Sequence, residues 1–245
     1  MLNAGVITSK ENQGAGSQNR PLLLDLYCGA GGASRGYQNA GFRVIGNDIK
    51  EQPHYIGDDF IMMDALQLMA RLLDGRSITG HGGQSYKLDD FRIIAASPPC
   101  QRYSWETPED YKSSHPDLIG PTREALIATG RPYIIENVAG ARGKLIFPAM
   151  LCGSMFGLGV WRHRYFEVFD GAKHLLLLTP PCNHSNVPIL VTGTPRRKGY
   201  PRQDPSKCQK EHAIGIDWMI TTELDQAIPP AYTEWLGRRI LEAAS

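Results

Sequence analysis

A cysteine follows two prolines in the stretch Ser97-Pro-Pro-Cys100-Gln101, directly after the apolar run 91–96. Proline fixes φ and lacks an N–H donor, so this arrangement restricts the backbone around the thiol. A thiol at the end of a strand is well placed to act as a nucleophile. The alternative is a buried, unreactive cysteine, which is the commoner state of a single cysteine.

Two further motifs carry charged side chains. Glu136 begins Glu-Asn-Val at the end of another apolar run, where a buried carboxyl group can hydrogen-bond the edge of a base or hold a proton. Arg162 and Arg164 lie on one side of an extended segment. Taken alone, these two arginines are also typical of a solvated strand face.

A glycine-rich turn, Cys28-Gly-Ala-Gly-Gly32, follows the apolar run 22–27. Glycine permits positive φ and lets the backbone approach a ligand, although this turn lacks the third glycine of the dinucleotide fingerprint. Asp48 and Asp64 end the next two apolar runs, and their carboxylates can accept hydrogen bonds from ribose hydroxyls and an adenine amino group. Each alone could be a helix N-cap, but together with the turn they describe an adenosine site.

These residues need a scaffold that brings strand ends together. Apolar runs alternate with stretches of helical spacing, which is typical of βαβ units and a parallel sheet. Strands are expected at 22–27, 43–47, 60–63, 91–96 and 133–135, and helices at 33–40, 65–73, 121–129 and 232–244. Residues 76–90 and 101–118 are expected to be loops. Open α/β sheets bind ligands at the carboxyl ends of their strands, where the polar residues above lie.

The composition is that of one ordinary globular domain. The chain has 245 residues, of which 42% are hydrophobic and 21% charged, and its net charge of +1 excludes a uniformly basic or acidic protein. Residues 1–20 do not read as a signal peptide, no apolar stretch is long enough to span a bilayer, and the five scattered cysteines suit reduced thiols. We therefore expect a cytoplasmic protein that binds no membrane.

The order of these motifs resembles that of the DNA (cytosine-5) methyltransferase family. The motifs are Asp25-Leu-Tyr-Cys-Gly-Ala-Gly-Gly, the acidic strand ends, Pro-Pro-Cys-Gln, Glu-Asn-Val, Arg-x-Arg and the C-terminal Gln226-Ala-Ile-Pro-Pro-Ala-Tyr. The similarity covers about residues 21–168 and 214–243. It implies an α/β fold, the Rossmann-like fold of class I S-adenosylmethionine-dependent methyltransferases, with a small loop-rich target-recognition insertion. It also implies S-adenosyl-L-methionine as methyl donor and a cytosine of double-stranded DNA as acceptor.

The resemblance assigns catalytic roles to four residues. Cys100 matches the nucleophile and Glu136 the acid that contacts the base, whereas Arg162 and Arg164 match the arginines that support the flipped cytosine and the cysteine. A thiolate that adds to C6 turns the ring into an enamine, whose C5 can attack a sulfonium methyl group. The base must first leave the stacked duplex, and the loop that carries Trp105 is a candidate lid.

The resemblance also implies contacts to the donor and to DNA. The donor site would consist of Tyr27, Ala30, Gly31, Gly32, Asp48, Ile49, Asp64, Ala65, Pro98 and Gln226. Two of these depart from the family pattern, because Asp48 replaces a more common Glu and Gln226 an Asn. DNA contacts are expected from Gln101, Tyr103 and Ser104 in the loop after the nucleophile.

Residues 171–212 differ from the rest of the chain in charge. They hold seven Lys and Arg against two Asp and Glu, which gives +5 and leaves −4 for the remainder. Phosphate attraction should concentrate there, and we expect DNA contacts from Arg196, Arg197, Lys198 and Arg202. So short a segment would read a target of about two to four base pairs. A solvated basic loop is the alternative.

We therefore expect a flexible lead at 1–20, a catalytic domain at 21–170 and 213–245, and a target-recognition segment at 171–212. The enzyme is expected to be a monomer, with a cognate restriction enzyme as one candidate partner. Two alternatives stay open. One is an RNA cytosine-5 methyltransferase, and the other is a catalytically idle DNA-binding module, which is disfavoured because every chemistry position is occupied.

Cysteine and histidine pairs in the basic segment could bind zinc. Cys182, His184, Cys208 and His212 offer four ligands, and a small segment without its own core gains from a metal. The spacing of the first pair is tighter than that of zinc fingers, so ordinary loop residues, and no metal, are the favoured interpretation.

Overall fold

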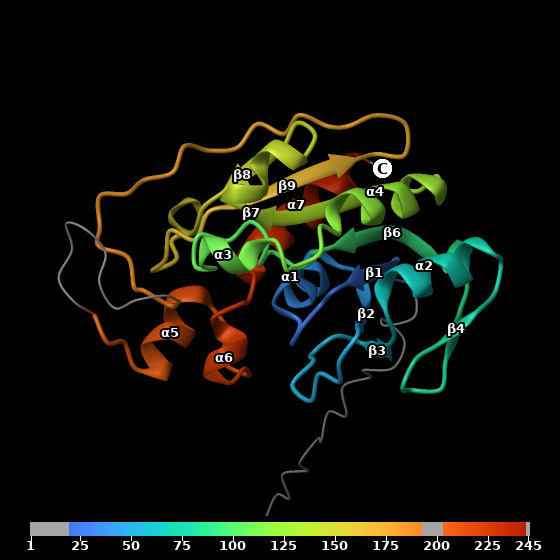
Figure 1. Cartoon of the computed structure of the whole chain (residues 1–245), viewed down its shortest axis with the longest axis horizontal. Coiled ribbons are helices and arrows are strands. Elements are labelled where there is room, and N and C mark those ends of the chain that lie inside the picture. The colour runs from blue at the N-terminus through green and yellow to red at the C-terminus, as the bar shows by residue number, and fades with distance from the viewer. Residues whose placement is uncertain (1–19, 193–202, 244–245) are drawn as a thin grey trace, which may run out of the picture.

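A seven-stranded sheet forms the centre of the protein in the computed structural model, which describes residues 20–192 and 203–243 (Figure 1). In spatial order the strands are β3 (Asp59–Met62), β2 (Arg43–Asp48), β1 (Leu22–Leu26), β6 (Phe91–Ala96), β7 (Tyr133–Val138), β9 (Arg164–Phe169) and β8 (Ala149–Leu151). Only the pairs that β9 makes with β7 and β8 are antiparallel. Strand order reverses between β1 and β6, so the predicted Rossmann-like α/β fold is confirmed.

Helices cover both faces of this sheet (Figure 1). One core joins the sheet to α2 and α4, and the other joins it to α1 and α7. Successive strand residues face opposite sides, so a strand covered on both faces is mostly apolar along its length, and the few buried polar residues need partners. The longer helices are α1 (Gly32–Ala40), α2 (Ala65–Leu73), α4 (Ile119–Ala128), α5 (Lys207–Ile214) and α7 (Pro230–Ala243).

Short elements complete the described part of the chain. They are the hairpin β4 (Ile78–Thr79) and β5 (Ser85–Tyr86), the helices α3 (Glu109–Lys112) and α6 (Thr221–Leu224), and the 3-10 turns η1 (Leu88–Asp90), η2 (Ala139–Lys144) and η3 (Gly153–Phe156). A third apolar cluster packs Ile214, Met219 and Leu224 against Ala30 of the glycine turn. Helices α5 and α6 therefore lie against the same turn that the sequence singles out.

The connection between β2 and β3 contains no helical turn, and Tyr55 packs within it. A Cβ atom at Gly46 would lie 2.3 Å from the ring of Tyr55, and one at Gly57 would lie 2.0 Å from its hydroxyl oxygen. At Gly31, where φ is +86°, a Cβ atom would lie 3.1 Å from the same ring. Three glycines that are far apart in sequence therefore make room for one aromatic side chain.

Several sequence predictions of secondary structure need correction. The strand expected at 133–135 continues to Val138, because it pairs with β9 over its full length. Strands β8 and β9 were not predicted, and the expected loops contain α3 and the β4–β5 hairpin. Helix α5 crosses the predicted boundary between residues 212 and 213. Within the described ranges, no helix is both long and apolar enough to cross a membrane.

Candidate active site

A cleft of about 1200 Å³ opens at the carboxyl ends of β1, β2, β6 and β7. The segment before β9, residues 188–192 and parts of 219–228 complete its wall. Most of the predicted site residues line it: Tyr27, Ala30, Gly32, Asp48, Ile49, Pro98, Cys100, Gln101, Ser104, Glu136, Arg162, Arg164 and Gln226. The cleft lies where the strand order reverses, which is where Rossmann-like sheets bind their ligands.

The turn after β1 presents main chain to the cleft. Tyr27, Gly29 and Gly31 have φ values of 60°, 50° and 86°, all in the left-handed region. A Cβ atom at Gly32 would lie 2.6 Å from the carbonyl oxygen of Ile228, so a side chain is excluded there. Gly32 thus makes room for Ile228, whereas a Cβ atom at Gly29 would meet nothing within 4 Å, so a ligand in the cleft can approach the main chain closely there.

Asp48 ends β2 with its carboxylate beside the glycine turn. Its two oxygens accept hydrogen bonds from the amides of Gly29 and Lys50, each at 3.1 Å. These bonds fix the carboxylate and leave further lone pairs for a ligand hydroxyl. The neighbouring Ile49 is 63% exposed on the cleft rim, where it offers an apolar surface to a flat ligand.

Among the predicted site residues that the structure describes, four do not line the cleft: Gly31, Asp64, Ala65 and Tyr103. Asp64 caps α2, and its carboxylate accepts a hydrogen bond of 3.0 Å from the amide of Gln67. Ala65 belongs to the core below α2. The aromatic ring of Tyr103 packs against that same core, with its hydroxyl beside Asp117. The helix-cap interpretation of Asp64 thus describes its contact in this structure.

Cys100 lies just past β6, half-buried on the cleft wall. Strand β7 holds the loop that carries Cys100, because the side-chain Nδ2 of Asn137 donates a hydrogen bond of 2.9 Å to the carbonyl oxygen of Pro98. Burial, and then the nearby Glu136, raise the pKa of the Cys100 thiol, while Arg164 and Arg162 act in the opposite direction. The two arginines are thus the groups that favour the thiolate.

Glu136 lies within β7 and is 7% exposed. The Nε atom of Arg164 approaches its Oε1 at 3.1 Å, although Oε1 accepts no well-aligned hydrogen bond from the described residues. Burial raises the pKa of Glu136, and the charges of Arg164 and Arg162 only partly offset this effect. The carboxyl group can therefore hold a proton more readily than an exposed glutamate.

Arg162 lies two residues before the start of β9 and reaches across to the C-terminal part of the chain. Its guanidinium donates to the carbonyl oxygen of Asp225, and its own carbonyl accepts a hydrogen bond of 2.9 Å from the hydroxyl of Tyr232. Burial and the charge of Arg164 lower the pKa of Arg162 to about 9, so it remains charged at neutral pH. Two fixed cations thus face the thiol and the carboxyl group.

Sequence reasoning gave no role to three residues that hold this arrangement. Asn137 fixes the Pro-Pro-Cys loop, and Tyr232 and Asp225 fix Arg162. The Glu-Asn-Val motif could have indicated a role for Asn137. Adjacent strand residues face opposite sides, so Glu136 can face the cleft while Asn137 holds the neighbouring loop. No local pattern connects Tyr232 with Arg162, which lie 70 positions apart.

The loop after Cys100 is folded rather than irregular. The guanidinium of Arg102 donates a hydrogen bond of 2.9 Å to the carbonyl oxygen of His115, which closes the loop around α3. Trp105 is 85% exposed and lies on the cleft rim. An indole left in solvent at the mouth of a polar cleft is a candidate contact for a bound base.

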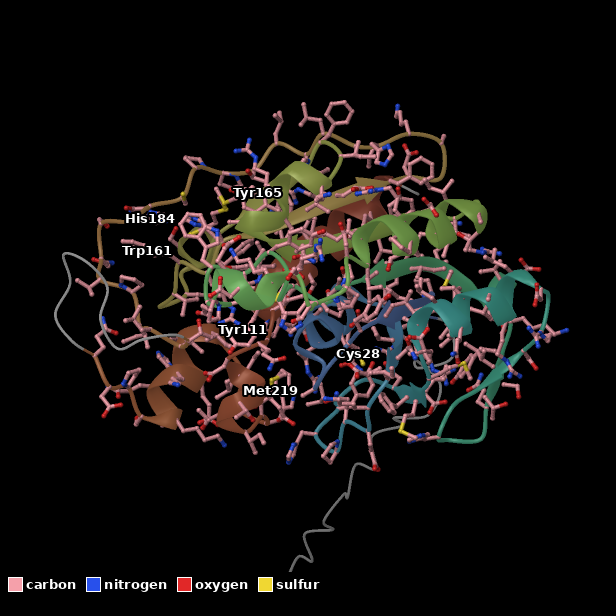
Figure 2. The ribbon with its side chains drawn as sticks, viewed as in Figure 1. Cys28, Tyr111, Trp161, Tyr165, His184 and Met219 are labelled. Atoms are coloured by element: carbon pink, nitrogen blue, oxygen red, sulfur yellow. The ribbon has the colours of Figure 1, made fainter. Side chains whose placement is uncertain are left out.

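The basic residues expected to bind DNA, Arg196, Arg197, Lys198 and Arg202, lie outside the described residues. The described part of the same segment has two features. Residues 188–192 form part of the cleft wall. Figure 2 shows His184 beside Trp161, and their ring centroids are 4.0 Å apart. Cys208 and His212 are exposed on α5 and are not grouped with Cys182 and His184 as the sequence suggested.

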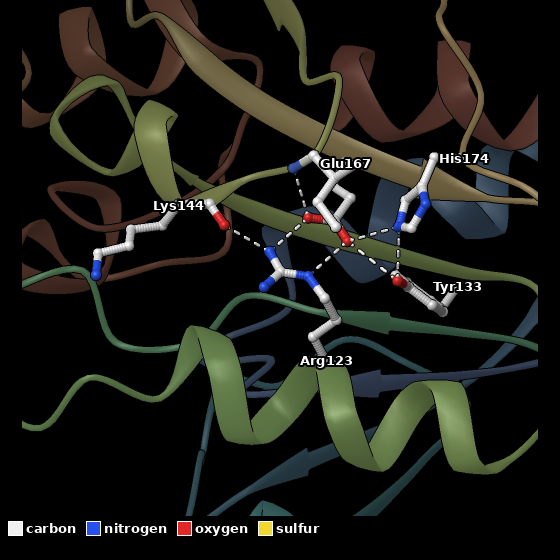
Figure 3. A network of polar contacts seen from close by, with 6 residues as sticks. Arg123, Tyr133, Lys144, Glu167 and His174 are labelled. Atoms are coloured by element: carbon white, nitrogen blue, oxygen red, sulfur yellow. Dashed lines mark hydrogen bonds and ion pairs between the residues drawn. The ribbon is translucent and has the colours of Figure 1, made fainter.

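A second buried carboxylate lies on the opposite face of the sheet (Figure 3). Glu167 of β9 accepts hydrogen bonds of 2.8 and 2.6 Å from the guanidinium of Arg123 on α4. It also accepts bonds from the hydroxyl of Tyr133 and the amide of Ile146, and His174 lies 3.2 Å away. None of these five residues lines the cleft, so this network joins α4 to the sheet.

No protein-family model and no curated protein matches the chain. Solved structures that match include a putative DNA modification methyltransferase encoded within an Escherichia coli prophage. The match covers 60% of this chain and 45% of the prophage protein, with 21% identity and a TM-score of 0.38. The match to the Entamoeba histolytica methyltransferase EhMeth covers 93% of this chain and 100% of EhMeth, with 11% identity and a TM-score of 0.49.

Another similar structure is that of the S. pombe Dnmt2 methyltransferase. It covers 63% of this chain and 51% of its own, with 16% identity and a TM-score of 0.39. This chain thus spans about half the length of the prophage protein and of Dnmt2, and the full length of EhMeth.

Proposed function

We propose that this protein is an S-adenosylmethionine-dependent methyltransferase that acts on C5 of a cytosine flipped out of double-stranded DNA. The observation that carries the proposal is the convergence of Cys100, Glu136, Arg162 and Arg164 on one cleft beside a glycine turn. These four residues come from three different strand ends. Their types match a thiol nucleophile, a proton-holding acid and two cations that stabilise developing negative charge.

The donor half of the cleft fits an adenosine with a flexible tail. Asp48 offers carboxylate oxygens to ribose hydroxyls, and exposed Ile49 offers an apolar surface to the adenine face. The turn at Gly29 offers bare main chain to the methionine part. S-adenosylmethionine, when bound, supplies a methyl group on a sulfonium, which is an electrophile. Gln226 also lines this half and is exposed.

The acceptor half fits a single base. The Cys100 thiolate would form a bond to C6, and the electron pair of the C5–C6 double bond would become available at C5 for a bond to the methyl carbon. The bond between that carbon and the sulfonium sulfur would break with its electron pair returning to sulfur, so S-adenosylhomocysteine is the leaving group. A base then removes the C5 proton, the C5–C6 double bond re-forms, and the thiolate leaves. The charges of Arg164 and Arg162 favour the thiolate in both the first and the last step.

Glu136 has the properties that the first step requires. Negative charge moves toward O2 and N3 of the ring when the thiolate adds, and a protonated carboxyl group at N3 neutralises it. Burial raises the pKa of Glu136, which increases the protonated fraction, and Arg164 holds the group in place. An arginine near O2 stabilises the charge from the other side.

The nucleic acid would reach the cleft past the loop 101–108. Gln101 and Ser104 line the cleft, and exposed Trp105 can stack on a base or fill its place in the duplex. Tyr103 packs away from the cleft, so we expect it to shape this loop rather than to contact DNA directly. The basic residues 196–202 remain candidates for phosphate contacts and for reading a short target.

The decisive test is the variant Cys100→Ala. It should abolish methyl transfer to duplex DNA and retain binding of S-adenosylhomocysteine, measured by calorimetry. The wild-type protein should also form a covalent complex with a duplex that contains 5-fluorocytosine, and the variant should not. Assays on duplex DNA, tRNA and free nucleotides separate the proposed substrate from RNA. Turnover by the variant near the wild-type rate would refute the nucleophile assignment.

A further inference from the structure

Two cysteines and two histidines converge beside the cleft, whose wall includes one of them, His163. The side chains of Cys152, His163, Cys182 and His184 each offer one sulfur or nitrogen atom, and all four atoms lie within 4.8 Å of one another. The Sγ atom of Cys152 and the Nε2 atom of His184 are 3.3 Å apart. We propose that these four residues bind one structural Zn²⁺ ion.

The spacing of the donor atoms fits a tetrahedral zinc site. Zinc bonds of about 2.3 Å to sulfur and about 2.0 Å to nitrogen place neighbouring donor atoms of a tetrahedron about 3.3–3.8 Å apart. The distance between the Cys152 sulfur and the His184 nitrogen already falls in this range. The largest distance between any two of the four donor atoms, at most 4.8 Å, exceeds the top of the range by only about 1 Å. Thiolate and imidazole ligands in a set of two and two favour zinc over magnesium or calcium.

The fold brings the first two ligands together by strand pairing. Strands β8 and β9 are antiparallel, with Leu151 opposite Arg164. Cys152 and His163 are the next residues outward on each strand and therefore face each other across the hairpin. Beyond them, the amide of Gly153 donates a hydrogen bond of 3.2 Å to the carbonyl oxygen of Trp161. Half of the site is thus built on the rigid sheet.

The other two ligands come from an irregular segment that is held at the same place. The Oγ atom of Ser154 lies 3.2 Å from the Sγ atom of Cys152 and accepts a hydrogen bond of 3.0 Å from the amide of Asn183. Asn183 is the residue between Cys182 and His184. A single hydroxyl group therefore connects the sheet-borne cysteine to the segment that carries the second pair of ligands.

Aromatic stacking orients the histidines. The ring of His184 lies on the indole of Trp161, with an interplanar angle of 17°, and its centroid is 5.1 Å from that of His163. Neighbours that fix the orientation of a ligand ring are typical of metal sites, because they reduce the entropy lost on coordination. Cys152 is fully buried, whereas His184 is exposed, so an ion could enter from the solvent side.

The segment has a structural need for such a link. Residues 175–192 contain no helix or strand, and Leu176, Leu178 and Val187 are exposed large hydrophobic residues. Although Leu175, Leu177, Ile189 and Val191 pack against the neighbouring clusters, a segment without regular structure gains further stability from a metal bond. The same segment supplies residues 188–192 of the cleft wall. His163 lies between Arg162 and Arg164, so the ion would also hold the two cationic side chains in position.

The experiment measures zinc in the full-length protein and needs no methyl-transfer assay. Protein purified without chelator should contain about one zinc per chain by mass spectrometry of the element, and Co²⁺ should replace it with the visible absorption of a tetrahedral thiolate site. Cys182→Ser and His184→Ala, which lie at half-buried and exposed positions, should weaken zinc affinity more than about 100-fold in a chelator competition. Circular dichroism shows whether each variant is folded.

The matched control is the double variant Cys208→Ser/His212→Gln, which removes the exposed cysteine and histidine on α5. It should keep its zinc. Three results would overturn the proposal: wild-type protein that takes up no stoichiometric zinc or cobalt, equal zinc loss in the control, or a Cys152–Cys182 disulfide. Thiol titration tests for the disulfide, after the protein is treated with chelator and denatured. Five reactive thiols are expected, and a disulfide would leave three. Activity of the wild-type protein has no bearing on these outcomes.

Discussion

Neighbouring strands of the sheet each carry a buried glutamate beside an arginine, and the two pairs differ in how fully their polar atoms are satisfied. Glu167 of β9 receives two hydrogen bonds from Arg123, one from Tyr133 and one from the amide of Ile146 (Figure 3). Glu136 of β7 has an ion pair with Arg164 and the hydroxyl of Ser97 nearby, but its Oε1 accepts no well-aligned hydrogen bond from the described residues.

The two environments shift the pKa of their glutamates in opposite directions. Burial alone would raise the pKa of Glu167, but the hydrogen bonds from Arg123 and the Ile146 amide outweigh it and hold the pKa below its usual value. Burial raises the pKa of Glu136, and Arg164 does not cancel the effect. A fully satisfied buried carboxylate stabilises the fold, whereas an incompletely satisfied one in a cleft is typical of a group reserved for a substrate.

The largest expected effect is on catalysis, through Glu136→Gln. The amide keeps the shape of the side chain but cannot transfer a proton, so methyl transfer should fall by about 10²- to 10⁴-fold. The free energy of unfolding near pH 8 should not decrease, because the change removes a poorly satisfied buried charge. Single-turnover methylation and denaturant unfolding measure the two quantities. A variant that retained half the wild-type rate would place Glu136 outside the proton chemistry.

Glu167→Gln should have the reverse profile. It leaves the guanidinium of Arg123 buried without its anion, which should lower the free energy of unfolding by about 3 kcal/mol or more. Affinity for S-adenosylhomocysteine per folded molecule should not change. The double variant Arg123→Met/Glu167→Gln is the matched control, because removing both charges should restore part of the lost stability. An unfolding midpoint equal to that of the wild type would show that the network is not structural.

Glu136 and Glu167 should contribute to the free energy of unfolding with opposite dependence on pH. Native Glu136 keeps its proton above pH 4.5 while the unfolded chain releases it, so this group makes the wild type less stable as pH rises through that window. Native Glu167 releases its proton below pH 4.5, so its contribution is present above that pH and is lost on acidification.

Unfolding curves at a series of pH values test this difference. Relative to the wild type, Glu136→Gln should gain stability as the pH rises above 4.5, and the deficit of Glu167→Gln should shrink as the pH falls below 4.5. The same sign for both variants would show that the environments of the two glutamates are not opposed as described.

The smallest expected effect concerns a third carboxylate, Asp64. Asp64→Ala removes the cap of α2 and should lower the free energy of unfolding by about 1 kcal/mol, whereas Asp64→Asn should retain most of it because Asn also caps helices. Calorimetry with S-adenosylhomocysteine then tests the adenine contact implied by the resemblance. Equal weakening of binding in both variants, by about tenfold, would show that the carboxylate contacts the donor as well.

Sequence reasoning located much of this architecture because local signals agree with the fold. Strand β6 and helix α2 have their predicted bounds, since the apolar run of one ends at prolines and the helical period of the other ends at Asp74-Gly75. The carboxyl ends of parallel strands meet at one edge, so Asp48, Cys100 and Glu136 could be expected to converge. They do line a common cleft.

The elements that were missed depend on long-range contacts or weak periodicity. Strand β8 has three residues, too few to show a pattern, and β9 forms by antiparallel pairing with β7. Helix α5 has few apolar residues, but Ser206 and Gln209 form a capping box that a search for helix starts could have found.

The cysteine and histidine cluster shows the same limit of local reasoning. The sequence suggests grouping Cys182 and His184 with Cys208 and His212, which lie in the same segment. The structure groups them with Cys152 and His163 instead, because the β8–β9 register brings those two together. A register between two unpredicted strands cannot be derived from spacing along the chain.

The packing of Tyr55 among Gly31, Gly46 and Gly57 has a consequence for how this sequence can change during evolution. While the tyrosine is present, alanine is excluded at Gly46 and Gly57, because a methyl group would overlap the phenol ring. Loss of the ring would release both positions at once. In homologous sequences we therefore expect residues 46 and 57 to be glycine wherever residue 55 is aromatic, and to vary together wherever it is small. Deep mutational scanning in the wild-type and Tyr55→Ala backgrounds would reveal this dependence.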